Sequence, residues 1–216
     1  MHKHYGFSRA VAFSLLILGV AGCATHQEYS TTQVQAISLT HESLVQDGIA
    51  FITPSSITGQ EEDRQSLAQS FVLALRDKRP DLHVVSLPET LGAINSQGLS
   101  AEYKSMFVDY GVTGIFDRDK LRNVSAVAGA RYLAQLKLQG FQQDAKGRWG
   151  ALGFRILETK VTRMRLFLQI WDSRDGSIAW EGSQELLTAR EKVSEDGMSF
   201  RNAAQFASES MIGKLP

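Results

Sequence analysis

Residues 131–140, RYLAQLKLQG, and residues 167–182, FLQIWDSRDGSIAWEG, decide the fold. Apolar and polar residues alternate in both stretches, and this is the period of a strand with one buried face. Between Trp171 and Trp180 the chain has the composition of a turn, in which Gly176 can adopt a positive φ. With a further strand at 177–187, these residues predict a three-stranded antiparallel meander.

The residues upstream of the meander predict a β-α-β unit. The apolar run 48–56 (GIAFITPSS) and the run 82–88 (LHVVSLP) each have the length of a buried strand. Pro80 ends the amphipathic helix between them. A strand, a helix and a strand of these lengths form a right-handed crossover with parallel strands.

Further helices are expected on either side of the meander. Ser100 and Asp117 can each cap a helix before it, and Ser199 can cap a C-terminal helix after it. Residues 143–153, QDAKGRWGALG, are rich in glycine and are expected to form a loop. The order predicts an α/β (α+β) fold with one mixed sheet: a βαβ unit, a helical segment, a three-stranded antiparallel meander and a C-terminal helix. Its helices are expected mainly on one face.

The N-terminus predicts export and lipidation. A basic start, the apolar run 10–19 and small residues before Cys23 form a secretory signal, too short for a membrane-spanning helix. Residues 20–23, VAGC, resemble the lipobox of bacterial lipoproteins, which implies cleavage after residue 22 and a covalent lipid on Cys23. Ala24 in place of aspartate implies sorting to the outer membrane, on its periplasmic face. The alternative is a secreted protein whose Cys23 is incidental.

The expected organisation is a signal peptide at 1–22, a lipidated tether at 23–47 and a single periplasmic α/β domain at 48–216. A short strand around residues 34–39 is an alternative for part of the tether. Removal of the signal leaves 21 basic and 23 acidic residues, a formal charge of −2. This charge excludes a polybasic nucleic-acid binder. The mature histidines, His26, His41 and His83, lack zinc spacing, and the one cysteine is assigned to the lipid, so no metal or other cofactor is expected.

The turn at 172–177 is the stretch that most resembles a site. Counted as an EF-hand loop on Gly176, it places Trp171 at the first ligand position and Gly182 at the twelfth, so it does not match. As a catalytic pair, Asp172 and Asp175 are expected to be exposed, with nothing to separate their pKa values. A simple hairpin turn is the favoured interpretation.

Two surfaces are candidate partner sites. A helical stripe and the strand residue Trp171 either contact a partner or pack on the sheet; Trp171 shares a face with Arg165 and is expected to be partly exposed. The basic segment 146–165 either meets an anionic partner or is a solvated hairpin face. The candidate partner residues are Tyr103, Met106, Phe107, Tyr110, Arg148, Trp149 and Trp171.

The order of the elements resembles a group of periplasmic domains. The βαβ unit, a helical stretch ending in GARYLAQLKLQG, the hairpin LFLQIWDSRDGSIAWEG and a last helix are similar to a shared domain. That domain occurs in the curli-secretion lipoprotein, the lipoprotein activator of penicillin-binding proteins and the amino-terminal part of TolB. The resemblance covers residues 48–215 by pattern. It implies architecture and location but supplies no catalytic residue.

Three classes of function stay open. The leading hypothesis is a non-enzymatic binding or assembly lipoprotein, with an envelope protein or a second copy of itself as partner. The second is a subunit of an oligomeric secretion complex of the curli-channel type, for which residues 154–164 are the only long membrane-strand candidate and have no continuous apolar face. The third is a cell-wall enzyme, with its acids drawn from Asp117, Asp119, Asp172 and Glu181.

Overall fold

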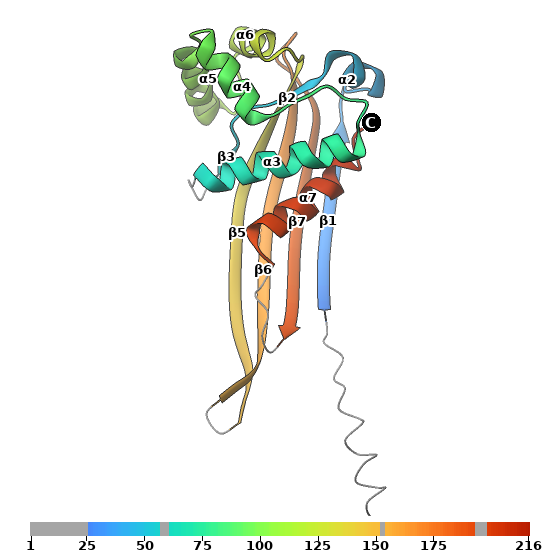
Figure 1. The fold of residues 1–216 in the computed structure, drawn as a ribbon, viewed down its shortest axis with the longest axis vertical. Coiled ribbons are helices and arrows are strands. Elements are labelled where there is room, and N and C mark those ends of the chain that lie inside the picture. The colour runs from blue at the N-terminus through green and yellow to red at the C-terminus, as the bar shows by residue number, and fades with distance from the viewer. Residues whose placement is uncertain (1–25, 57–60, 152–153, 193–197) are drawn as a thin grey trace, which may run out of the picture.

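The computed structural model describes residues 26–56, 61–151, 154–192 and 198–216. The expected signal peptide and Cys23 therefore lie outside the described residues. The described chain forms one sheet of long strands that is crossed by helices and extends well beyond them at one end (Figure 1). This is the predicted α/β class with a mixed sheet.

The sheet has the strand order β1-β7-β6-β5-β2-β4, and the short strand β3 also pairs with β5. Neighbours are antiparallel from β1 to β5 and parallel where β2 meets β5 and β4. The described strands are β1 (His26–Ala36), β2 (Ile49–Phe51), β3 (Ser55–Ser56), β4 (Val84–Val85), β5 (Tyr132–Ala151), β6 (Phe154–Asp172) and β7 (Ile178–Lys192).

The predicted meander is confirmed as β5, β6 and β7. Its strands are longer than expected, because β5 continues to Ala151 through most of the segment predicted as a loop. The glycines there are accommodated by register shifts near Gly147 and Gly150, where the ladder is irregular but is not interrupted. Residues 152–153 of that predicted loop lie outside the described part.

The predicted β-α-β unit is also confirmed. β2 and β4 are parallel, and helix α3 (Glu61–Lys78) connects them. The sequence 58–61, TGQE, has the spacing of a capping box before α3, but its first three residues lie outside the described ranges. β5 lies parallel to β2 on its other side, so the meander continues the same sheet.

The helical segment comprises α4 (Leu87–Ser96), α5 (Ser100–Thr113) and α6 (Arg118–Ala128), and α7 (Phe200–Ile212) follows the meander. The Asp117 side chain accepts a hydrogen bond from Lys120 N–H, and Ser199 caps α7 in the same way. Ser100 is instead the first residue of α5, whose N-cap is Leu99 without a side-chain bond. None of the described helices has the length and apolarity to cross a membrane.

Helices cover both faces of the sheet, which corrects the expectation of coverage mainly on one. α3 and α7 lie across one face and enclose a core that includes Phe71, Leu136 and Leu168. α4, α5 and α6 cover only one end of the other face, with Leu133, Phe116 and other residues in a second core (Figure 1). The remainder of that second face, over the lower halves of the long strands, carries no described helix.

The segment predicted as a tether differs from the structure. Residues 26–36 form β1, which pairs with β7 along its whole length, and residues 41–47 form helix α2 (His41–Asp47). Thr40 caps α2, and its hydroxyl accepts a hydrogen bond from Ser43 N–H at 3.2 Å. The folded part of the chain therefore begins by His26, well before the predicted boundary at residue 48.

Candidate functional site

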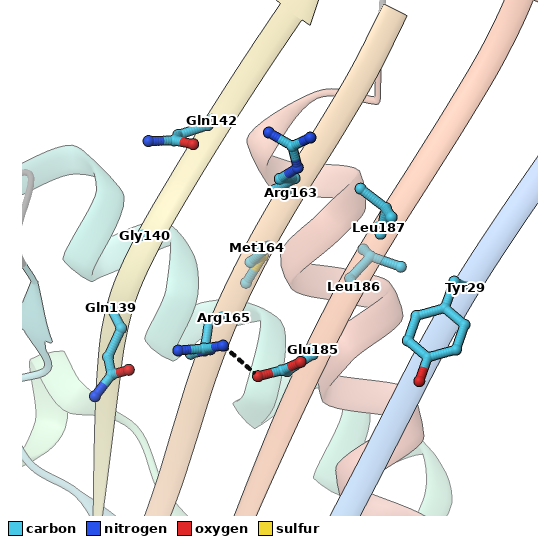
Figure 2. Close-up of a pocket in the computed structure, with 10 residues that line it drawn as sticks. All are labelled: Tyr29, Gln139, Gly140, Gln142, Arg163, Met164, Arg165, Glu185, Leu186 and Leu187. Atoms are coloured by element: carbon cyan, nitrogen blue, oxygen red, sulfur yellow. Dashed lines mark ion pairs between the residues drawn. The ribbon is translucent and has the colours of Figure 1, made fainter.

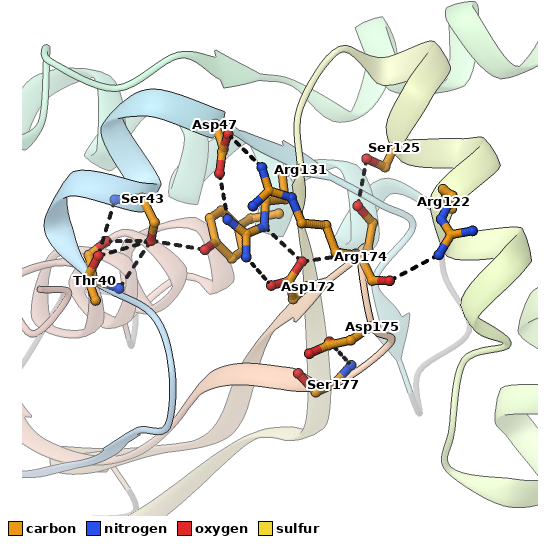
Figure 3. Close-up of polar contacts among 12 residues, drawn as sticks. Thr40, Ser43, Asp47, Arg122, Ser125, Arg131, Asp172, Arg174, Asp175 and Ser177 are labelled. Atoms are coloured by element: carbon orange, nitrogen blue, oxygen red, sulfur yellow. Dashed lines mark hydrogen bonds and ion pairs between the residues drawn. The ribbon is translucent and has the colours of Figure 1, made fainter.

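The turn that joins β6 and β7 is held in a polar cluster at the helix-covered end of the sheet (Figure 3). Gly176 has φ of 78°, as a tight turn requires, and its N–H donates to the Asp172 carbonyl at 2.9 Å. The Asp175 carboxylate accepts from Ser177 N–H. The hairpin-turn interpretation is therefore confirmed.

Asp172 does not have the exposed position expected from the sequence. Its side chain is only 6 % exposed and forms a bidentate pair with Arg131, with Nε–Oδ1 at 2.9 Å and Nη2–Oδ2 at 2.5 Å. Arg131 immediately precedes β5, and Asp172 is the last residue of β6, so antiparallel pairing brings the two together. The planar guanidinium matches the two carboxylate oxygens, which makes this a strong and directional contact.

A second carboxylate completes the neutralisation of Arg131. Asp47, the last residue of α2, accepts from Arg131 Nη1 at 2.6 Å and is approached by Arg174 Nη2 at 3.4 Å. The Arg131 guanidinium also lies 4.8 Å from the centre of the Tyr132 ring. The Tyr132 hydroxyl donates to the Ser43 hydroxyl in α2 at 2.9 Å. We call Asp47, Arg131, Asp172 and Arg174 the Arg131 cluster.

The turn is also attached to α6. Ser173 donates to the Ser125 hydroxyl, which itself donates to the Ala130 carbonyl, both at 2.8 Å. Arg122 donates from Nη2 to the Arg174 carbonyl at 3.1 Å. The β6–β7 turn is thereby fixed to α2, to α6 and to the start of β5, which are distant in sequence.

The charges of the Arg131 cluster balance, with two arginines against two aspartates. Burial raises the pKa of Asp172, but the hydrogen bonds from Arg131 and from Arg174 N–H outweigh burial and hold this pKa below its ordinary value. The hydrogen bond to Asp172 raises the pKa of Arg131 in turn. A neutral, internally bonded cluster offers no unsatisfied charge to a ligand, so its chemistry is that of a structural clasp.

The other candidate acids are not gathered around this cluster. Asp117 caps α6, and Asp119 forms an exposed ion pair with Arg118 at 3.3 Å. Glu181 accepts from the Gln169 amide at 2.6 Å on the sheet. Within the described ranges, no three His, Cys, Asp or Glu side chains gather closely enough to hold a metal ion.

The helical stripe proposed as a partner surface packs inside the protein instead. Met106 is fully buried, and the Tyr103 hydroxyl donates to Thr53 Oγ1 at 2.9 Å. Phe107 and Tyr110 both contact Phe116, with ring centres 5.4 and 4.2 Å away. The packing alternative holds for this stripe.

Trp171 is likewise buried, with 3 % of its surface exposed. Its ring contacts Phe116 at 5.1 Å and Tyr110 at 6.2 Å, both edge-on. The expectation that Trp171 is partly exposed was therefore wrong. Trp171 does share a face with Arg165, but α5 covers the Trp171 end of that face and leaves the Arg165 end open. The side chains of Arg148 and Trp149 lie outside the described part of the structure.

The uncovered part of the second face contains a shallow hollow of about 420 Å³ (Figure 2). Arg165 and Glu185 cross its floor as an ion pair at 2.6 Å, and both side chains are more than half exposed. Tyr29 on β1 is 63 % exposed at one side of the hollow. Sequence reasoning missed this face because it assigned most of β1 to a tether and allowed a strand only around residues 34–39.

The Arg131 cluster was missed for a different reason. Its members come from residues 47, 131, 172 and 174, and no local spacing connects them. Only the placement of Arg131 at the start of one meander strand, opposite the end of the next, could have indicated the contact with Asp172.

The fold and the cluster together define an α/β protein with a partly uncovered mixed sheet. No protein-family model and no curated protein matches the chain. Similar solved structures include the PelC dodecamer from Paraburkholderia phytofirmans, at 14 % identity and a TM-score of 0.42, covering 87 % of this chain and 94 % of that one. Lipoprotein GNA1162 from Neisseria meningitidis is similar at 12 % identity and a TM-score of 0.39, covering 75 % of this chain and 94 % of that one.

Proposed function

We propose that this chain is a non-enzymatic lipoprotein, anchored through Cys23 on the periplasmic face of the outer membrane, whose α/β domain binds or assembles an envelope partner. The spacing between the lipobox and the sheet supports this proposal most. Only Ala24 and Thr25 separate Cys23 from His26, the first residue of β1. Three Cα steps reach at most about 11 Å, so an acylated Cys23 holds the sheet itself close to the membrane.

This spacing also orients the domain. Through successive strand pairs, His26 lies at the level of Ala145 in β5. β5 continues to Ala151, about 20 Å farther at the rise of a strand. With Cys23 in the membrane, the β5–β6 hairpin therefore faces the lipid surface, and the Arg131 cluster with α4, α5 and α6 faces away (Figure 1).

This orientation brings the basic segment 146–165 to the membrane end of the molecule. The sequence there holds six lysines and arginines and one glutamate. Anionic headgroups attract such a segment by about 1 kcal/mol per basic residue near the surface. The orientation thus favours the anionic-partner interpretation of this segment.

Metabolic labelling with a fatty-acid probe tests the anchor. Wild-type protein should incorporate the label and sediment with the outer membrane, whereas Cys23→Ala should lose both properties. The neighbouring substitution Thr25→Ala is a matched control and should keep both. Labelled Cys23→Ala protein would refute the anchor, whatever its partner.

The enzyme alternative has less support. Asp172 is neutralised by Arg131, and Asp117 is occupied as a helix cap. Purified protein should leave peptidoglycan and phospholipid substrates intact. Hydrolysis that disappears in Asp119→Asn or Glu181→Gln would establish an enzyme instead.

A further inference from the structure

The sheet ends in two edges that lack a partner strand in the described part of the chain. β1 is the last strand on one side, and its edge away from β7 is unpaired. On the other side, β2 and β3 pair with β5 only as far as Leu138. Beyond Leu138, β5 presents a second unpaired edge that begins at Gln139.

Along β1, the residues whose backbone N–H and C=O groups point toward β7 alternate with residues whose groups point away from it. Ile37 N–H donates to the Ala179 carbonyl at 3.0 Å, and Ala36 is the register partner of Trp180. Because inward and outward groups alternate along an antiparallel strand, the N–H and C=O groups of the even-numbered residues, among them Glu28 and Ser30, point away from β7. An unpaired row of this kind is a template for another strand.

The two edges match in level and direction. Three antiparallel steps separate β1 from β5, so the two strands run in opposite directions. Residues 27–31 of β1 lie level with residues 140–144 of β5, so a second molecule in the same orientation would present β5 antiparallel to β1 at the same height. The residues of one such row are Tyr29, Leu187, Arg163 and Gln142.

The edges carry few features that normally prevent such pairing. β1 contains no proline, lysine or arginine, and residues 139–144 of β5 contain none either. Proteins protect exposed edges with these residues, especially lysine and proline. Beyond Leu138, the first basic residue of β5 is Lys146, which lies outside the matched level.

Side chains on the uncovered face also complement each other. Tyr29 is 63 % exposed, and nothing lies within 4 Å of the position that a Cβ at Gly140 would occupy. In the paired arrangement Gly140 of the second copy is a diagonal neighbour of Tyr29. An aromatic ring placed over a cross-strand glycine stabilises a sheet by covering its exposed backbone.

We propose that the partner of this face is a second copy of the chain, joined by antiparallel pairing of β1 in one copy with residues 139–144 of β5 in the next. The contact is head-to-tail, so it propagates into a closed ring or a row of copies along the membrane. This contact extends the assembly role proposed above and rests on that proposal. The unpaired edges themselves do not depend on the lipid anchor.

Disulfide cross-linking of the full-length protein in cells tests this contact. Tyr29→Cys with Gln142→Cys should form a ladder of multimers on a non-reducing gel. Within one molecule three strand spacings, about 14 Å, separate these positions, and a disulfide requires Cα atoms within about 7 Å, so the bond must join two copies. Thr31→Cys with Gln142→Cys detects a register shifted by two residues, and a ladder from either pair supports the proposal.

Matched controls separate the possible outcomes. Tyr29→Cys with Lys137→Cys should not cross-link, because β3 covers β5 at Lys137. Glu28→Pro, which removes an outward N–H, should suppress the ladder while circular dichroism stays unchanged. Wild-type protein shows whether Cys23 alone forms disulfide-linked multimers.

Three results would overturn the proposal. They are the absence of a ladder from both cysteine pairs, dimers formed by Tyr29→Cys alone, and a ladder from the Lys137 control pair. Fatty-acid labelling of the same cysteine-pair variants, in which Cys23 is retained, separates the two proposals. A ladder without fatty-acid label refutes the anchor and keeps the edge pairing, whereas label without a ladder does the opposite.

Discussion

Asp172→Asn tests whether the Arg131 cluster is the clasp that fixes the β6–β7 turn. Removing one partner of a buried ion pair typically costs 3–5 kcal/mol of unfolding free energy. In this variant Arg131 keeps its ion pair with Asp47, and its side chain is 20 % exposed, so the expected loss of unfolding free energy is smaller. We therefore expect about 2–3 kcal/mol, or a melting temperature lower by about 5–10 °C for a chain of this length.

Urea unfolding followed by circular dichroism at pH 7 measures this loss. Asp119→Asn is the control, because its ion pair with Arg118 is exposed on both sides and should cost less than about 1 kcal/mol. A double-mutant cycle with Arg131→Gln should show that most of the Asp172 effect disappears once Arg131 is gone. Equal losses from Asp172→Asn and Asp119→Asn would contradict the assignment of a clasp.

The same variant predicts a pH dependence. The folded pKa of Asp172 lies below its ordinary value of about 3.9, so its charged form stabilises the fold. That stabilisation is complete above the ordinary value and is lost as the pH falls through the folded pKa. The stability gap between wild type and Asp172→Asn should therefore be constant near neutral pH and close below about pH 4. A stability difference that persists at this low pH would indicate that the substitution acts through altered packing rather than through the lost charge.

Three further substitutions test the packing. Gly182→Ala should cost about 1–3 kcal/mol in urea unfolding, because a Cβ would approach the Trp180 ring to 2.8 Å or less; unchanged stability would mean that Trp180 can move. Tyr103→Phe should cost about 1 kcal/mol in the same assay through its lost bond to Thr53, and a neutral result would make that bond dispensable. Val112→Asp, at a position 84 % exposed, should stay within about 0.5 kcal/mol of wild type unless Val112 lies in an interface.

The sequence predicted the parts of the fold that local patterns encode. Alternation along 132–138 and 164–170 gave the meander, and the capping side chains of Asp117 and Ser199 gave the starts of two helices. Most of β1 was missed, beyond the short strand allowed around residues 34–39, because most of its described residues are exposed at the sheet edge and no hydrophobic alternation marks them. Polarity alone made this strand resemble a linker.

The candidate site was less predictable than the fold. The exposure of Asp172 was misjudged because burial there depends on Arg131 and on α2, whose positions only the folded sheet determines. The aromatic stripe containing Tyr103 and Met106 was found correctly as a helical face. Whether such a face is internal or external depends on which side of the sheet the helix lies, and the helical period carries no such information.

The pairing of β1 with β7 has a consequence for the order in which the chain folds. His26 is paired with Arg190 and Ala36 with Trp180, so the first described strand finds its partner only near the other terminus. Contacts so distant in sequence form late and slow folding. β1 therefore cannot complete this edge of the sheet until the chain is available through Arg190. The proposed export would delay the same step, because a chain that crosses a membrane from its N-terminus presents β7 last among the strands.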